Sequence, residues 1–231
     1  MIIYLGSEPK GWLAAEVLRF SIEKHVKEPV EFKEIRNLHL ETPLKAKPGS
    51  PFYRWFVPHF ESYQGKVLYL DSSVVVLGDI SDLMTLDMKG KGALAQAITR
   101  PSDTGGFYSA ALLFDCEKLG SWNPETWAIK LAQDKSLYEK TMWALPGGLT
   151  HDEVGSFPES LIKRDEPGEK MIHFADPLKK PWQNPEHPHR ELFLSLLKEA
   201  VEAQKIPLEP ILLEIQMGNI YPKILEDMMQ A

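Results

Sequence analysis

The 231-residue sequence has a single cysteine, no long apolar run and no excess of positive charge. A disulfide needs two cysteines and a zinc centre built on cysteines needs several. The sequence therefore excludes an intrachain disulfide and a multi-cysteine zinc site. Cys116 stands in the apolar stretch ALLFDCEKL, where we expect a buried and unreactive thiol.

The charge balance argues against nucleic acid as a partner. The chain has 26 lysine and arginine residues against 33 aspartate and glutamate residues, for a formal net charge of -7. Nucleic-acid-binding domains normally present a basic face, and none is expected here. A few local cations would still suffice for a phosphorylated ligand.

Segments typical of targeting or membrane insertion are also missing. No run approaches the ~18 apolar residues of a spanning helix. The opening MIIYLG is too short for a secretory signal and lacks its basic start. We expect no transmembrane segment and a cytoplasmic location, with peripheral membrane contact left open.

The apolar pattern predicts an α/β fold. MIIYLGS is typical of a strand with a turn at its end, residues 11–26 have apolar side chains at helical spacing, and PVEFKEI alternates like a second strand. The near-continuous apolar run GKVLYLD is typical of a central strand. We expect a mixed, mostly parallel central sheet flanked by helices. One domain is expected over residues 1–231, with a core over 1–182 and a C-terminal helical extension over 183–231.

Three further segments carry local signals. The aromatic stretch at residues 52–63 is a helix candidate. Thr150 and Glu153 have the spacing of a capping box, which predicts a helix start there. His187 and His189 lie in a proline-rich segment that is either a metal-binding tract or, as we favour, a solvated loop.

Asp71 ends the central strand, and three interpretations of it are open. It could be a turn residue that bonds the amides of the next residues, a helix cap, or a ligand for a hard cation such as Mg²⁺ or Mn²⁺. His173 ends another predicted strand, MIHF, and is followed by two lysines. It is either a strand-end histidine beside a solvated basic loop, or a metal ligand next to phosphate-binding cations.

Several motifs in order resemble one family. Residues 50–83, SPFYRWFVPHFESYQGKVLYLDSSVVVLGDISDL, resemble the core of the family 8, glycogenin-like glycosyltransferases. Members carry an arginine in an aromatic helix, a Gly-Lys-x-Leu-Tyr-Leu-Asp strand and then Val-x-Gly-Asp-Ile-x-x-Leu. YSAALLFDCEKLGSW is similar to the family's Asn-Ser-Gly strand, and IHFADPLKKPW to its late His-Phe-x-Gly-x-x-Lys-Pro-Trp element. The resemblance covers most of residues 2–182.

The resemblance implies a single-domain, Rossmann-like A-type fold and a retaining transferase that uses a nucleotide sugar such as UDP-glucose or UDP-galactose. The acceptor, which is a glycan, lipid or protein, and the catalytic residue are not identified. Mn²⁺ or Mg²⁺ would be held by Asp71, Ser73 and His173. The residues matched to nucleotide-sugar binding are Gly6, Ser7, Glu8, Arg54, Asp71, Ser72, Ser109, Lys179 and Lys180.

The chain also departs from the family pattern at its site. Ser73 stands where the second metal-binding aspartate is expected, which should weaken or abolish metal binding. Tyr108 replaces the asparagine of Asn-Ser-Gly, and Asp176 replaces a glycine near the diphosphate. Three hypotheses follow: an active glycosyltransferase, a pseudoenzyme that binds nucleotides or glycans, and an α/β protein with another phosphate ligand.

Overall fold

The computed structural model describes residues 1–6, 9–38, 51–98, 106–120, 123–134, 136, 152–176 and 180–231. The chain forms two compact units. The first unit comprises Met1–Glu8, Glu28–Asp71 and Ser81–Glu159, and the second comprises Pro9–Lys27, Ser72–Ile80 and Ser160–Ala231. The expected division at residue 182 stays a prediction.

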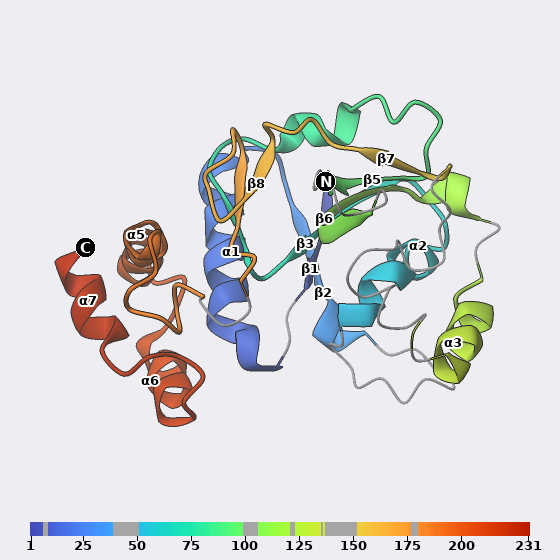
Figure 1. Ribbon diagram of the computed structural model, residues 1–231. Helices are drawn as coiled ribbons and strands as arrows, with labels where there is room; N and C mark the ends of the chain where they lie inside the picture. Colours follow the sequence, from blue (N-terminus) through green and yellow to red (C-terminus); the bar gives the residue numbers. More distant parts are fainter. Residues whose placement is uncertain are drawn as a thin grey trace. The chain divides into compact units, whose positions relative to one another are not determined.

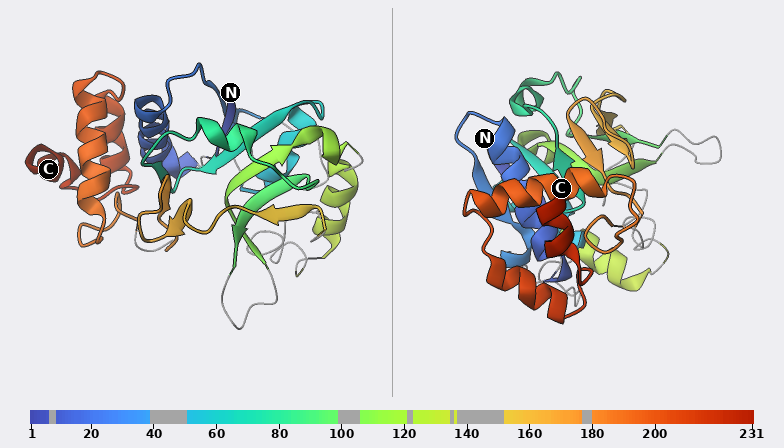
Figure 2. Two further views of the ribbon diagram at one scale, coloured as in Figure 1. Left: turned by 90° about the horizontal axis from the view of Figure 1, so that it is seen from above. Right: turned by 90° about the vertical axis from the view of Figure 1, so that its left-hand side faces the viewer.

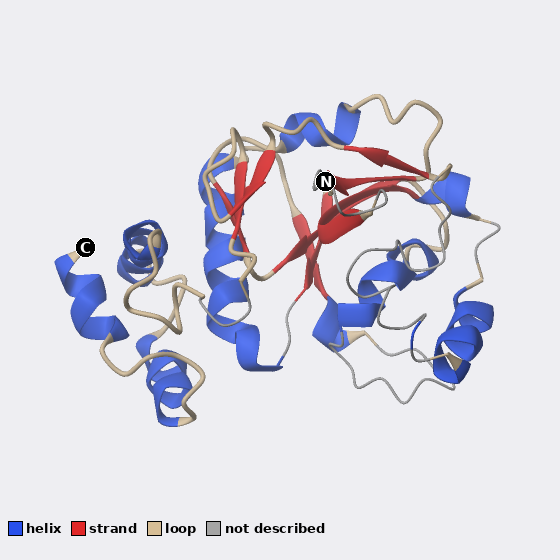
Figure 3. Cartoon of the chain, viewed as in Figure 1, coloured by secondary structure: helices blue, strands red, loops and turns tan. Residues whose placement is uncertain are grey.

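The first unit contains a six-stranded sheet (Figures 1 and 3). Its strands are β1 (Ile2–Gly6), β2 (Glu31–Glu34), β3 (Lys66–Asp71), β5 (Ala93–Ala97), β6 (Phe107–Asp115) and β7 (Val154–Ser156), in the order β2-β1-β3-β6-β5-β7. Strand β1 is parallel to β2 and β3, and β5 is parallel to β7, whereas β6 is antiparallel to both of its neighbours. This confirms the expected fold class, a mixed α/β fold with a mostly parallel sheet.

Strands β1 and β3 are buried on both faces, which explains their near-continuous apolar sequences. One face carries Tyr4 and Tyr69, which share a core with Trp55, Phe56 and Val57. These three residues come from the 3₁₀ helix Pro51–Phe56 and the short helix α2 (Val57–Phe60). The helix predicted over residues 52–63 is thus a 3₁₀ turn that continues into one α-helical turn.

Two further segments of the first unit are a capped helix and a short strand. Helix α3 (Pro124–Gln133) begins after Asn123, whose side chain accepts a hydrogen bond of 3.0 Å from the Thr126 amide. The helix start predicted around Glu153 is wrong for the described part of that segment. Residues 154–156 form β7 instead, because they pair with Ala93–Ala95 of β5, and tertiary pairing overrides a local capping signal.

The described part of the second unit combines a small sheet with four α-helices. The sheet has the order β4 (Val74–Val76), β9 (Met171–His173) and β8 (Ile162–Arg164). The helices are α1 (Trp12–His25), α5 (Arg190–Glu202), α6 (Leu208–Gln216) and α7 (Ile224–Gln230). Helix α1 packs against β4 and α5, and α7 packs against α5 (Figure 2). None of the helices in the described ranges is long and apolar enough to cross a membrane.

Candidate functional site

The carboxyl ends of β1 and β3 lie side by side in the first unit. Gly6 pairs with Asp71 in the parallel register, and Tyr4 pairs with Tyr69 two residues earlier. Because side chains alternate along a strand, Tyr69 and Asp71 belong to the same face of the sheet. Ligands of open α/β sheets bind beyond the carboxyl ends of the strands, so this edge is the place to look for a site.

Arg54 reaches this edge from the 3₁₀ helix Pro51–Phe56. Its Nη1 donates hydrogen bonds to the carbonyl oxygen of Ser109 (2.9 Å) and to the Ser109 hydroxyl oxygen (2.8 Å). Its Nη2 lies 3.8 Å from Oδ2 of Asp71, and the guanidinium carbon lies 5.3 Å from the centre of the Tyr69 ring. Only 8% of the Arg54 side chain is exposed, and these contacts offset the cost of burying its charge.

Gly6 leaves room for the hydroxyl of Tyr69. A Cβ atom at position 6 would lie 2.1 Å from the Tyr69 hydroxyl oxygen, so a larger residue would force the tyrosine to move. The same hydroxyl lies 3.4 Å from Oδ2 of Asp71. Glycine at the end of β1 and tyrosine within β3 are therefore sterically matched.

The structure brings Gly6, Arg54, Asp71 and Ser109 together. We call these four residues and Tyr69 the first-unit cluster. Of the other residues matched to donor binding, Ser7 and Glu8 lie outside the described residues. Sequence reasoning missed Tyr69. The alternation of side chains along β3 could have identified Tyr69, because residues 69 and 71 point to the same face of the sheet. That this cluster binds a nucleotide sugar stays a prediction at this point.

The second unit holds Ser73 and His173 close together. Val74 pairs with His173 in the antiparallel register of β4 and β9, and the Phe174 amide donates a 2.9 Å hydrogen bond to the Ser73 carbonyl oxygen. Ser73 and the Nδ1 atom of His173 are buried. Ser72 lies in the turn before β4, with its hydroxyl 3.3 Å from the position that a Cβ on Gly11 would take.

Lys180 is the described member of the predicted lysine pair, and Lys179 lies outside the described residues. The Lys180 ammonium donates a hydrogen bond to the carbonyl oxygen of Phe174, and it lies 6.0 Å from the centre of the Trp182 ring. These contacts hold the cation beside the end of β9.

The metal site expected from the sequence remains a prediction. The described residues contain no group of three histidine, cysteine, aspartate or glutamate side chains that could hold a metal ion. Asp71 belongs to the first unit, whereas Ser73 and His173 belong to the second. The donor types fit Mn²⁺ or Mg²⁺, since oxygen ligands suit hard cations and imidazole can add a nitrogen. Because this ligand set has one carboxylate where the family pattern has two, it should bind the metal ion more weakly.

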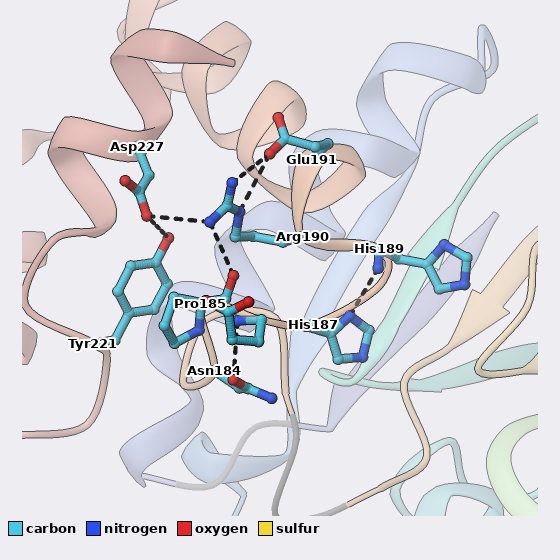
Figure 4. A network of polar contacts seen from close by, with 9 residues as sticks. Asn184, Pro185, His187, His189, Arg190, Glu191, Tyr221 and Asp227 are labelled. Carbon is cyan, nitrogen blue, oxygen red and sulfur yellow. Dashed lines mark hydrogen bonds and ion pairs between the residues drawn. The ribbon is translucent and has the colours of Figure 1, made fainter.

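His187 is an exception to the solvated loop expected for the proline-rich segment. Only 7% of His187 is exposed, and its ring meets Phe174 edge-on, with the ring centres 5.3 Å apart. Its Nδ1 accepts a 3.1 Å hydrogen bond from the His189 amide (Figure 4). The pKa of His187 is lowered mainly by burial and, to a smaller extent, by the nearby His189. The histidine is therefore part of the second unit's packing.

Arg190 links the same segment to the C-terminal helix. Its Nη1 donates to the carbonyl oxygen of Pro185 at 2.9 Å and lies 3.6 Å from Oδ2 of Asp227 in α7. The Tyr221 hydroxyl donates to the same carboxylate at 3.0 Å (Figure 4). These contacts give the segment after β9 a structural role.

Comparison with known proteins finds glycosyltransferases. Residues 14–110 match the family model described as Glycosyl transferase family 8. Glycosyltransferase GlyE of Streptococcus pneumoniae is 43% identical over 70 residues, which are 30% of this chain and 17% of GlyE. Glycosyltransferase GlyB of the same organism is 28% identical over 137 residues, which are 58% of this chain and 30% of GlyB. In these sequence matches the chain therefore spans less than a third of the length of either relative.

Solved structures show the same fold. The apo form of GlyE superposes with a TM-score of 0.64 at 19% identity, covering 88% of this chain and 63% of GlyE. The galactosyltransferase LgtC, in complex with donor and acceptor sugar analogs, gives 0.63 at 13% identity, covering 86% of this chain and 96% of LgtC. At these identities the likeness establishes the A-type glycosyltransferase fold alone.

Proposed function

We propose that the chain, whose residues 14–110 match the Glycosyl transferase family 8 model, is a member of that family. It would transfer a hexose from a nucleotide diphosphate sugar, UDP-glucose or UDP-galactose, to a glycan, lipid or protein acceptor, with retention at the anomeric carbon. The observation that carries this proposal is the first-unit cluster. It places a buried arginine, a partly exposed aspartate and a serine at the carboxyl ends of parallel strands.

The chain's own residues would act on the donor through charge and orientation. The Arg54 guanidinium supplies positive charge near the nucleotide and also fixes Ser109. Asp71, with 26% of its side chain exposed, presents a carboxylate to the ligand. By the family resemblance, Lys179 or Lys180 would add positive charge that offsets the leaving diphosphate. Cytoplasmic location remains a prediction from the sequence.

Asp71, Ser73 and His173 would hold Mn²⁺ or Mg²⁺, as the family resemblance implies. When bound, the metal would neutralise charge on the departing nucleotide diphosphate. Ser73 contributes a neutral hydroxyl, so the affinity for metal should be low. A Ser73→Asp variant should show a stronger dependence of nucleotide binding on Mn²⁺, and an unchanged dependence would place Ser73 away from the ion.

The alternative proposal is a pseudoenzyme that binds the nucleotide or a glycan without turnover. Ser73, Tyr108 and Asp176 favour it, because each replaces a residue that the family uses around the donor. The two proposals differ in turnover and agree on binding. A test must therefore measure both.

Thermal unfolding with UDP, UDP-glucose, UDP-galactose and ADP, each with and without Mn²⁺, tests binding. A ligand at 100 times its Kd stabilises the folded state by about 2.7 kcal/mol. We expect the uridine nucleotides to raise the melting temperature more than ADP does. No shift at millimolar ligand would refute both the transferase and a pseudoenzyme that binds the nucleotide. Release of free UDP from a bound UDP-sugar, over time and with candidate acceptors, then separates the enzyme from the pseudoenzyme.

A further inference from the structure

Two tyrosines on neighbouring strands have closely similar surroundings. Tyr4 and Tyr69 are paired in the register of β1 and β3, and both are buried. The Tyr4 hydroxyl donates to Glu61, and Lys33 lies 5.8 Å from the centre of its ring. The Tyr69 hydroxyl lies 3.4 Å from Asp71, and Arg54 lies 5.3 Å from the centre of its ring. Each tyrosine thus carries a carboxylate at its hydroxyl and a cation over its ring.

The two groups differ in which charged partner solvent can reach. Around Tyr4 the carboxylate is the more buried partner, since the Glu61 side chain is 10% exposed and that of Lys33 is 31% exposed. Around Tyr69 the order is reversed, with Arg54 at 8% and Asp71 at 26%. The Tyr69 group therefore presents a carboxylate to the outside and keeps its cation inside.

We propose that Tyr69 is a positioning residue of the donor site, which orients the Asp71 carboxylate through its hydroxyl and holds Arg54 through its ring. This inference rests on the proposed function, because it assigns Tyr69 a role in binding the nucleotide. The hydroxyl has room only because Gly6 has no side chain. A 3.4 Å separation is long for a hydrogen bond, and contacts of this kind often tighten when the ligand binds.

The proposal makes Tyr69 act through Asp71 rather than on the ligand directly. A Tyr69→Phe variant keeps the ring, its packing and its contact with Arg54, and removes the hydroxyl alone. The carboxylate then loses one of the groups that fix its orientation. The loss should appear in nucleotide binding and should vanish when Asp71 itself is removed, since coupled residues are not additive.

The test is a calorimetric titration of UDP in the presence of Mn²⁺ with the wild type, Tyr69→Phe, Asp71→Asn and the double variant. Tyr4→Phe is the matched control, because it removes an equally buried hydroxyl on the paired strand. We expect Tyr69→Phe to raise the Kd of UDP about tenfold, as for loss of a hydrogen bond to a charged group. In the Asp71→Asn background the same change should cost less than about twofold.

Each outcome decides between the alternatives. An equal loss of affinity in Tyr69→Phe and Tyr4→Phe would show a general structural effect and overturn the proposal, as would full additivity with Asp71→Asn. Unchanged affinity in Tyr69→Phe would overturn it while leaving the proposed function intact. If the wild-type protein does not bind UDP, both the proposed function and this inference are refuted. Melting temperatures of the two phenylalanine variants, measured without ligand, separate loss of affinity from loss of fold.

Discussion

Arg54 offers a test of the first-unit cluster that needs no ligand. An Arg54→Lys substitution keeps the positive charge but replaces the planar guanidinium by a single ammonium group. The ammonium cannot make both Nη1 bonds to Ser109, approach Asp71 with a second nitrogen and stack on Tyr69 at once. Loss of one charge-assisted hydrogen bond costs about 1.5–3 kcal/mol and a desolvated cation–π contact adds up to about 2 kcal/mol.

Because lysine retains part of these contacts, we expect Arg54→Lys to lower the free energy of unfolding by about 2 kcal/mol. Urea unfolding at neutral pH measures this value. Arg36→Lys is the control, since Arg36 is paired with Glu34 at the partly exposed edge of the first unit. That change should cost less than about 0.5 kcal/mol. Equal unfolding free energies for Arg54→Lys and the wild type would refute the cluster as described.

Three further changes test other parts of the account. Gly6→Ala should destabilise the protein by about 1–3 kcal/mol in urea unfolding, because its methyl group displaces the Tyr69 hydroxyl, and unchanged stability would contradict the steric match. Burial raises the pKa of the Cys116 thiol to about 12, so the thiol stays protonated at pH 8. It should react with thiol reagents only after unfolding, and rapid labelling of the folded protein would contradict this. Burial lowers the pKa of His187 below its ordinary value of 6.5, so the unfolded state binds the proton more readily and stability should fall as the pH drops below about 6.5. A His187→Gln variant should lose less stability over that window, and an identical pH dependence would exclude this histidine as a source.

Local patterns predicted several of the elements. Apolar runs marked β1 and β3, and helical spacing marked α1, because burial on both faces of a strand or on one face of a helix requires apolar residues at regular positions along the sequence. What depends on distant partners could not be predicted in this way. Strand β7 exists because β5 pairs with it, and His187 is buried because Phe174 covers it.

The candidate site shows the same limit. The family resemblance pointed to Gly6, Arg54, Asp71 and Ser109 one by one, but their separation along the sequence gives no distances. Arg54 and Ser109 are 55 residues apart in the chain, yet they form two hydrogen bonds. The role of Tyr69 depends on the register between β1 and β3, which places its hydroxyl over Gly6. Only the folded sheet supplies that register.

The central claim is that the first-unit cluster belongs to a nucleotide-sugar site. Calorimetric titration of UDP-glucose and UDP-galactose into the folded protein, with Mn²⁺ present, tests this most directly. We predict saturable binding of one donor per chain, with weaker binding to an Asp71→Asn variant that remains folded under the conditions of the titration. No saturable heat at millimolar donor, or equal binding by wild type and Asp71→Asn, would contradict it.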